Sequence, residues 1–352
     1  KSDDNIAADF RELGINGSWR IMPNFHIAAQ LVWRDAGKTD KHEIRLDYGL
    51  ADYSFYSSES TLLGIRAGRV PIPLGLYNDT RDVASTRPGI FLPQSIYFDI
   101  NRNLALSADG GFLYSEHRTD FGDLLFNMGI INPRSDDPAF VHFFTNTPFG
   151  RFSGDIDGEM SWVGRLSYEW QGGTVRLAVT YADYNGKLDP KGVANPLLPG
   201  SFRFNPLIFS AQYNSENWSL TGEYALRRTR LNNFGLNGIL LFPDSDTTGE
   251  SYYVQGTYQF TSFLEGMLRY DVLYWDKADK SGNRFAAATG VSDHSRFAKD
   301  FTVGLRLKVM PSMLLSAEYH RVNGTGWLAA LENSKGTTQY WDLFAVMLSY
   351  DF

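Results

Sequence analysis

The final sixteen residues of the chain, Thr337 to Phe352, carry an apolar side chain at every second or fourth position. The row consists of Tyr340, Phe344, Val346, Leu348, Tyr350 and Phe352. Successive side chains of a β-strand point to opposite faces of the sheet, so this spacing predicts a strand with one face against an apolar environment. Two environments fit that pattern, the lipid of a membrane and the core of a soluble sheet.

The composition combines many aromatic side chains with a polar average. Aromatic residues make up 15% of the chain, with 25 Phe, 19 Tyr and 8 Trp, yet the mean hydropathy is −0.29. No apolar run approaches the roughly 18 residues that a membrane-spanning helix needs. A transmembrane β-barrel accounts for both facts, because lipid-facing and lumen-facing residues alternate along its strands and aromatic residues gather at the two membrane interfaces.

Alternating segments of about ten to fourteen residues recur along the chain, about fifteen in all, and clusters of Gly, Pro, Asn, Asp or Ser bound them. Clear apolar rows are Phe25, Ile27, Ala29, Leu31 and Trp33, then Met160, Trp162, Leu166, Tyr168 and Trp170, and Phe301, Val303, Leu305, Leu307 and Val309. Tight connections near Pro23, Ser58, Asp120, Gly172, Ser215, Thr261 and Pro311 alternate with long ones near residues 71–107, 134–157, 185–203, 230–250, 276–297 and 324–337. Short turns at one end and long loops at the other are typical of bacterial barrels.

The alternation of turns and loops also predicts the strand number. Single-chain bacterial barrels have an even number of strands, so one further strand is expected in residues 1–9 or upstream of Lys1. The predicted fold is all-β: residues 1–352 form a single transmembrane antiparallel barrel of about sixteen strands, with short periplasmic turns and long extracellular loops. A barrel of this size leaves an aqueous channel, whereas eight strands are filled by their own side chains.

Residues 66–107 break the period of two and contain Pro71, Pro73, Pro88 and Pro93 among many apolar and aromatic side chains, and residues 71–107 form the long loop of this stretch. A loop this long is usually functional, and its apolar residues need a surface to pack against. We therefore predict that it folds inward against the barrel wall as the constriction of the lumen. An extracellular Ω-loop, or a loop that latches onto a neighbouring subunit, is the alternative.

Residues 68–99, GRVPIPLGLYNDTRDVASTRPGIFLPQSIYFD, resemble the pore-narrowing region of proteobacterial outer-membrane porins similar to the phosphate-selective porin group. The final strand, which ends on an aromatic residue, resembles the C-terminal assembly signal of outer-membrane barrels. The resemblance implies a homotrimeric channel of sixteen strands in the outer membrane of a Gram-negative bacterium. The segment lacks a lysine cluster or a dense arginine run, so phosphate selectivity is not expected.

Charged residues are expected at two places in the channel. The constriction would carry Arg66, Asp79, Arg81, Asp82, Arg87, Asp99 and Arg102. The lumen face opposite the apolar rows would carry Arg45, Arg165, Arg176, Arg227, Arg269 and Arg306, and acidic residues such as Glu169, Glu223, Glu265, Asp271 and Glu318 share it. Arginine suits bidentate contact with carboxylates and phosphates, which gives a slight preference for anionic or carboxylate-bearing solutes. Each charge could instead form a salt bridge that stiffens the wall.

Other classes of chemistry are less compatible with the sequence. The chain has no cysteine, its six histidines are scattered, and no G-x-S-x-G or H-E-x-x-H element is present. We therefore expect no enzymatic activity, no cofactor and no metal. A net charge of −7 also argues against a nucleic-acid partner.

The sequence thus predicts an outer-membrane porin that allows passive diffusion of small hydrophilic solutes or ions, with outer-membrane lipid and lipopolysaccharide as its other partners. Two alternatives remain open. One is a substrate-specific uptake channel with a saturable site, and the other is a surface-binding barrel whose lumen is plugged.

Overall fold

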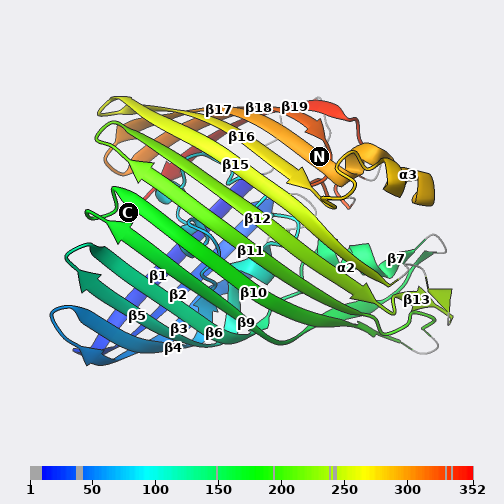
Figure 1. Cartoon of the computed structure of the whole chain (residues 1–352), viewed down its shortest axis with the longest axis horizontal. Helices are drawn as coiled ribbons and strands as arrows, with labels where there is room; N and C mark the ends of the chain where they lie inside the picture. The colour runs from blue at the N-terminus through cyan, green and yellow to red at the C-terminus, as the bar shows by residue number, and fades with distance from the viewer. Residues whose placement is uncertain are drawn as a thin grey trace.

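The computed structural model describes residues 10–36, 43–147, 150–192, 195–237, 239–240, 244–329, 331–333 and 336–351. Within this part, fifteen antiparallel strands form one sheet in sequence order (Figure 1). They are β1 (Phe10–Met22), β2 (Phe25–Ala36), β3 (Glu43–Ser57), β4 (Thr61–Pro71), β5 (Ser107–Thr119), β6 (Gly122–Pro133), β9 (Gly154–Trp170), β10 (Val175–Pro190), β11 (Ser201–Asn214), β12 (Trp218–Asn232), β15 (Ser245–Thr261), β16 (Leu264–Tyr274), β17 (Phe297–Met310), β18 (Met313–Gly324) and β19 (Tyr340–Tyr350).

The remaining elements are short and belong to the connections between these strands. Two-residue ladders pair β7 (Asn146–Thr147) with β8 (Gly150–Arg151) and β13 (Gly235–Leu236) with β14 (Ile239–Leu240). The helices are η1 (Asn78–Thr80), η2 (Ala84–Thr86), α1 (Arg102–Leu106), α2 (Pro138–Thr145), α3 (Asn283–Thr289) and η3 (Asp293–Arg296). Among the described residues, no helix has the length and apolar character needed to cross a membrane.

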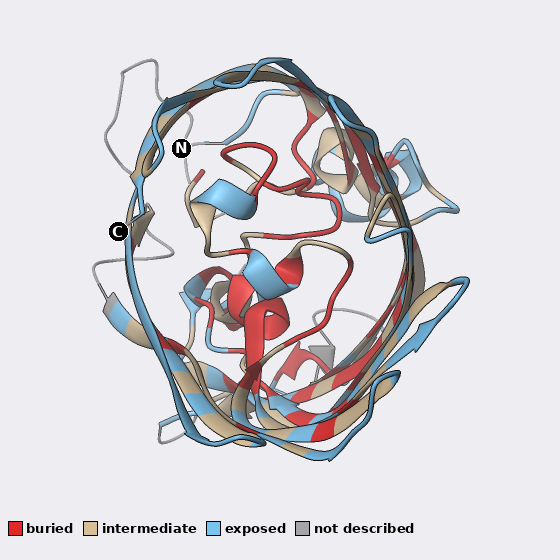
Figure 2. Ribbon diagram, turned by 90° about the vertical axis from the view of Figure 1, so that its left-hand side faces the viewer, coloured by how far each residue is buried: buried red, intermediate tan, exposed pale blue. Residues whose placement is uncertain are grey.

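The sheet curls into a ring when viewed along its strands (Figure 2), which confirms the predicted antiparallel β-barrel. Each strand pairs with the next along the chain, so the wall is a continuous up-and-down meander. The described residues account for fifteen strands of the wall. The additional strand predicted for residues 1–9 lies outside the described residues.

The outer face of the wall is apolar, as the alternating rows predict. In β19, Tyr340, Phe344, Val346, Leu348 and Tyr350 are each at least 59% exposed, and Asp342 shares this exposed face, while the residues that alternate with them are half-buried. Exposed aromatic and aliphatic side chains alternate in the same way along β9 and β17. A continuous apolar belt of this size cannot face water without promoting association, so a lipid surrounding is favoured over a soluble sheet. Phe352 lies outside the described residues.

The seven tight turns predicted from the sequence are confirmed, and all lie at one end of the barrel (Figure 1). They span residues 23–24, 58–60, 120–121, 171–174, 215–217, 262–263 and 311–312. We call this end the turn end, and the opposite end, which carries the longer connections, the loop end.

Residues 72–106, which connect β4 to β5, lie inside the barrel (Figure 2), and we call them the lumen segment. Its apolar side chains form a buried cluster with α2 and the inner faces of strands from β4 to β15. Asn78 joins the two ends of the segment, because its Nδ2 donates to the carbonyl oxygens of Ile72 at 2.8 Å and Ala105 at 2.6 Å. The segment thus packs against its own barrel rather than extending outward as a surface loop.

Candidate pore constriction

Inward carboxylates of the barrel wall hold the backbone of the lumen segment. Glu318 of β18 accepts hydrogen bonds from the amides of Ile90 at 2.7 Å and Phe91 at 3.2 Å. Asp271 of β16 accepts from the amide of Ser95 at 3.2 Å. Both acids are almost completely buried, and hydrogen bonds to ionised acceptors are among the stronger ones in proteins. These acids therefore fix one side of the segment to the wall.

On another part of the wall, Glu223 of β12 is a second anchoring point. Its carboxylate accepts from the hydroxyls of Tyr97 at 2.5 Å, Tyr253 at 2.8 Å and Ser210 at 2.5 Å, and from the amide of Leu76 at 3.1 Å. Four donors around one carboxylate satisfy the acceptor sites of a buried acid. This network ties both the beginning and the later part of the lumen segment to β12.

Wall arginines donate to backbone carbonyls of the same segment. Arg165 of β9 donates to the carbonyl of Gly75 at 2.9 Å and to Asp79 at 2.6 Å. Arg269 of β16 donates to the carbonyl of Phe91 at 2.9 Å, and Arg306 of β17 donates to that of Ser85 at 2.9 Å. Anchors on strands that are far apart around the ring fix the segment across the lumen.

Inside the segment, three of the predicted site arginines are buried. Arg81 donates to the carbonyls of Tyr97 and Phe98 and to Asp99 at 2.8 Å. Arg102 forms an ion pair with Asp82 and lies 3.6 Å from Asp99. Burial lowers the pKa of Arg102 well below its usual range, and neighbouring guanidinium groups lower it further. These charges hold the fold of the segment.

Arg87 is the third buried arginine, and its surroundings differ. Among the residues that the structure describes, the one hydrogen-bonding partner of its guanidinium is Sδ of Met347 on β19, at 4.0 Å. Burial lowers the pKa of Arg87, although Glu12 and Asp99 act in the opposite direction.

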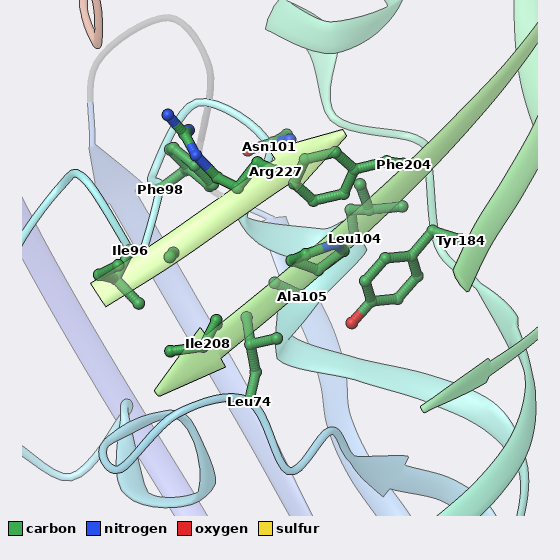
Figure 3. A pocket seen from close by; sticks show the side chains of 12 residues that line it. Leu74, Ile96, Phe98, Asn101, Leu104, Ala105, Tyr184, Phe204, Ile208 and Arg227 are labelled. Carbon is green, nitrogen blue, oxygen red and sulfur yellow. The ribbon is translucent and has the colours of Figure 1, made fainter. Parts of the chain in front are cut away.

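An apolar contact joins the other side of the segment to β10, β11 and β12 (Figure 3). Leu74, Ile96 and Leu104 of the segment face Tyr184 and Ile208 of the wall. Only about 10 Å³ of empty space remains between them, which is no more than a single water molecule requires. Close packing of this kind makes the segment part of the barrel core.

The structure divides the predicted pore-lining residues into two groups. Arg81, Arg87, Arg102, Arg227 and Arg269 are at most 6% exposed, and the side chain of Asp82 is 2% exposed. These six side chains are therefore buried in this structure, which leaves them little surface to present to a solute in the lumen. The physical reason is that most of them satisfy ion pairs and carbonyls of the protein; Arg227, for example, lies over the ring of Phe98 and donates to the carbonyl of Tyr274.

The other predicted residues retain exposed side-chain surface and lie at the lumen face or on the segment. They are Arg45, Arg66, Asp79, Asp99, Arg165, Arg176 and Arg306. Most of the arginines in this group have a carboxylate partner: Arg66 pairs with Asp52 at 2.7 Å, Arg176 with Glu169 at 2.8 Å and Arg306 with Glu265 at 2.9 Å. Arg45 donates to the side chain of Asn103 on the segment at 3.4 Å. The accessible positive charge is thus largely compensated.

Sequence reasoning missed several residues that hold the segment. The sequence pattern places Tyr97 and Asn78 only within a loop, and it does not predict the anchoring role of Glu223, Asp271 and Glu318. The contact between Tyr97 and Glu223 joins residues 126 positions apart, and the contact between Ile90 and Glu318 joins residues 228 positions apart. The available signal was weak: an acidic residue on the inner face of a strand is equally typical of a wall salt bridge.

The buried histidine His320 on β18 is the residue that most resembles a reactive group. Its Nδ1 lies 2.8 Å from Asp300 and its Nε2 lies 3.2 Å from Glu318. The adjacent hydroxyl of Thr302, at 3.1 Å, is fully buried, so no substrate could reach it in this arrangement. In the described part of the chain, no group of three or more His, Asp or Glu side chains is placed to hold a metal ion.

No protein-family model matches the sequence, and the comparison with curated proteins found no match either. Similarity in fold to solved structures is extensive. The outer membrane channel DcaP of Acinetobacter baumannii has a TM-score of 0.57 at 11% identity, over 98% of this chain and 86% of that chain.

Two further structures have a similar fold. The anion-selective porin from Comamonas acidovorans has a TM-score of 0.53 at 13% identity, over 89% of this chain and 78% of its own. The trimer form of OmpT, an outer membrane protein of Vibrio cholerae, has a TM-score of 0.56 at 10% identity, over 97% of this chain and 91% of that chain. At these identities the similarity establishes the fold, which is that of outer-membrane porin barrels.

Proposed function

We propose that this chain is a porin of a Gram-negative outer membrane, through which small hydrophilic solutes and ions diffuse passively. The lumen segment is the constriction in this proposal. The observation that carries it is the anchoring of residues 72–106 inside the barrel by Arg165, Glu223, Asp271 and Glu318. A segment held to several strands narrows the lumen without relying on a mobile loop.

The proposal includes a slight preference for anionic or carboxylate-bearing solutes. Arg165 and Arg306 support it, because both retain exposed surface where the wall meets the lumen segment. Neighbouring carboxylates limit its size, because Arg165 and Arg306 pair with Asp79 and Glu265 just as Arg66 and Arg176 pair with Asp52 and Glu169. We do not propose phosphate selectivity. The arginines inside the lumen segment are buried, and the resemblance of residues 68–99 to the phosphate-selective porin group is the only support for that finer assignment.

We further propose that the protein is a homotrimer embedded in outer-membrane lipid and lipopolysaccharide. Support comes from the apolar outer belt and from the similarity in fold to the trimer form of OmpT. The turn end would then face the periplasm and the loop end the cell exterior, as is usual for bacterial barrels.

The test is single-channel recording of the refolded protein in a planar bilayer, with a salt gradient across the membrane. Stable conductance steps are expected, with a reversal potential that corresponds to a small excess of anion over cation permeability. An Arg165→Met variant should alter the steps, because it removes the contacts with Gly75 and Asp79. A correctly folded barrel without conductance would overturn the porin proposal.

A plugged, surface-binding barrel is the second candidate function. One observation favours it: the lumen segment contacts not only β9, β12 and β16 to β19 but also the opposite wall, through Arg34 of β2 and Arg45 of β3. Contacts on all these sides reduce the cross-section open to solutes. The bilayer recording separates the two candidates, because a plugged barrel would insert into the membrane and remain silent.

A further inference from the structure

The lumen segment does not cover the inner face of the barrel wall evenly. Central inward residues of β12 and β18 are at most 5% exposed, namely Thr221, Glu223, Ala225, Arg227, Ser316, Glu318, His320 and Val322. The inward residues of β19 and β1 differ: Leu343, Ala345 and Met347 are half-buried, and Gly14, Asn16 and Ser18 are exposed. We call the inner faces of β19 and β1 the open side of the lumen.

We propose that solutes pass the lumen segment on the open side, and that Arg20 of β1 sets the preference for anions at the turn end of this route. The inference rests on the proposed function, because it assigns a route and a charged residue to the same channel. Four observations support it: the closed contacts elsewhere, the weak contacts on the open side, the cavity that leads to it and the surroundings of Arg20.

On its other sides the lumen segment closes against the wall. From β4 to β15 its apolar side chains and those of the wall form one buried cluster, and only about 10 Å³ remains empty at the contact with β10, β11 and β12. Towards β16 and β18, the carboxylates of Asp271 and Glu318 accept hydrogen bonds from the amides of Ser95, Ile90 and Phe91. Among the described residues, contacts of this kind leave no width for a hydrated solute.

The contacts between the lumen segment and the open side are weaker. Arg87 reaches Sδ of Met347 on β19 at 4.0 Å, and the ring of Phe91 lies edge-to-face with that of Phe10 on β1, with 5.9 Å between the centroids. A thioether is a weak acceptor, and a ring pair does not fix the backbone as a hydrogen bond does. The segment is thus least firmly held where the wall is most exposed.

A cavity of about 160 Å³ leads to the open side from the loop end. It is bordered by Phe91 of the lumen segment, by Leu343 of β19 and by Trp327 of the connection that follows β18. Among its charged groups, Asp99 pairs with Arg81 at 2.8 Å and Asp300 lies 2.8 Å from His320. Conduction requires that a solute leave as readily as it enters, so a roomy cavity with compensated charges suits passage rather than retention.

Arg20 lies at the other end of the route and differs from the paired arginines of the lumen. It is exposed on the inner face of β1, opposite His26, and directly precedes the turn at residues 23–24. Within the described residues it has no carboxylate partner, whereas Arg66 and Arg176 each have one. An uncompensated positive charge at the mouth of a channel raises the local concentration of anions.

The route can be tested with single cysteines, because the chain contains none. Ala345 pairs with Glu318, which holds Ile90 and Phe91, so it lies at the level of the lumen segment. In planar bilayers, the thiol-reactive anion 2-sulfonatoethyl methanethiosulfonate is added to Ala345→Cys. The conductance should fall at least about twofold, because the attached group narrows the route, and dithiothreitol should restore it.

Two controls use the same substitution. Ala225→Cys lies on the inner face of β12 in the closed contact, so it should neither be labelled nor lose conductance. Ala287→Cys is exposed on α3, so it should be labelled without a change in conductance. If Ala345→Cys does not fold, Ser18→Cys on β1 takes its place, since Ser18 is inward and exposed.

Arg20→Gln tests the charge. The reversal potential in a salt gradient should shift towards cation preference, and the shift should be larger near 0.01 M than near 1 M salt, since the Debye length falls from about 30 Å to about 3 Å. Arg11→Gln is the control, because it removes the same charge from the same strand on its outer face, where Arg11 pairs with Asp35. An equal shift in both variants, or none in Arg20→Gln, would refute the role of Arg20.

The outcomes separate this inference from the porin proposal. If wild type conducts but labelled Ala345→Cys and Ser18→Cys keep the full current, or neither is labelled, the protein remains a porin and the route is wrong. Labelling and block of Ala225→Cys would also overturn the route, because the contact with β12 would then be open. A wild type that inserts and stays silent overturns the porin proposal, and the route falls with it.

Discussion

Tyr97 offers the sharpest test of how the lumen segment is held. Its side chain is fully buried, and its hydroxyl donates to Glu223 at 2.5 Å while accepting from the amides of Leu76 at 2.8 Å and Tyr77 at 3.1 Å. Tyr97→Phe keeps the ring and removes all three hydrogen bonds. We expect this single oxygen atom to decide whether residues 72–80 stay closed against β12.

The size of the effect follows from these contacts. Loss of a hydrogen bond to a charged group costs about 1.5 to 3 kcal/mol, and an amide left without a partner costs about 1 to 3 kcal/mol. The amide of Leu76 still has Glu223 at 3.1 Å, whereas that of Tyr77 loses its partner. Allowing for relaxation, we expect a cost of about 3 kcal/mol, which corresponds to an opening equilibrium larger by roughly a hundredfold.

Hydrogen–deuterium exchange, followed by mass spectrometry of peptides that cover residues 72–80, measures this local opening directly. The matched control is Tyr184→Phe, because Tyr184 is equally buried but its hydroxyl has no hydrogen-bond partner in the described part of the chain. The control should exchange no faster than wild type. The reasoning is refuted if Tyr97→Phe exchanges at the wild-type rate, or if both variants accelerate exchange equally.

Three further predictions concern the same segment. Gly75→Ala should accelerate exchange in residues 72–80 at least as much as Tyr97→Phe, because Gly75 has φ +60° and a Cβ there would collide with the Tyr97 hydroxyl; a rate equal to wild type would contradict this. Arg102→Met should lower the free energy of unfolding in urea by about 3 to 5 kcal/mol, because it leaves Asp82 buried and unpaired. Adding Asp82→Asn to the same chain should restore most of that loss. An equal loss in the single and the double variant would show that the ion pair is unimportant. Burial alone would raise the pKa of Asp99, but the guanidinium groups of Arg81 and Arg34 outweigh it and lower the pKa below its usual 3.8. The ionised carboxylate therefore stabilises the fold above pH 4, and this stabilisation is lost as the pH falls through the lowered pKa of the folded state. The difference in unfolding free energy between wild type and Asp99→Asn should therefore be constant from about pH 7 to pH 5 and shrink below about pH 4; a loss near pH 6 would contradict the assignment.

Most of the barrel wall could be predicted without the structure. The alternation in β19 and β17 comes directly from the sequence, because the side-chain period of a strand is two and an apolar row needs an apolar surrounding. The sorting of tight turns and long connections also followed from local composition, and Pro23, Gly172 and Pro311 each lie at one of the observed turns. These features are local, so a window of about ten residues contains the information that determines them.

The lumen segment shows where such reasoning stops. Its length and its apolar content predicted that residues 71–107 need a surface, and the observed boundaries differ from that range by one residue at each end. Which of its charges would meet water was not predictable. Arg81, Arg102 and Asp82 have the composition of a charged constriction, yet they are buried in ion pairs with one another and with Asp99.

The sequence by itself thus determined the element type, the face of each strand that meets lipid and the approximate position of the inward segment. The tertiary structure alone decided which charges anchor that segment and which remain exposed to the lumen. The physical reason is range. Strand periodicity acts between neighbours in the chain, whereas the contact between Ile90 and Glu318 joins residues 228 positions apart and forms only when the barrel wall brings them to 2.7 Å.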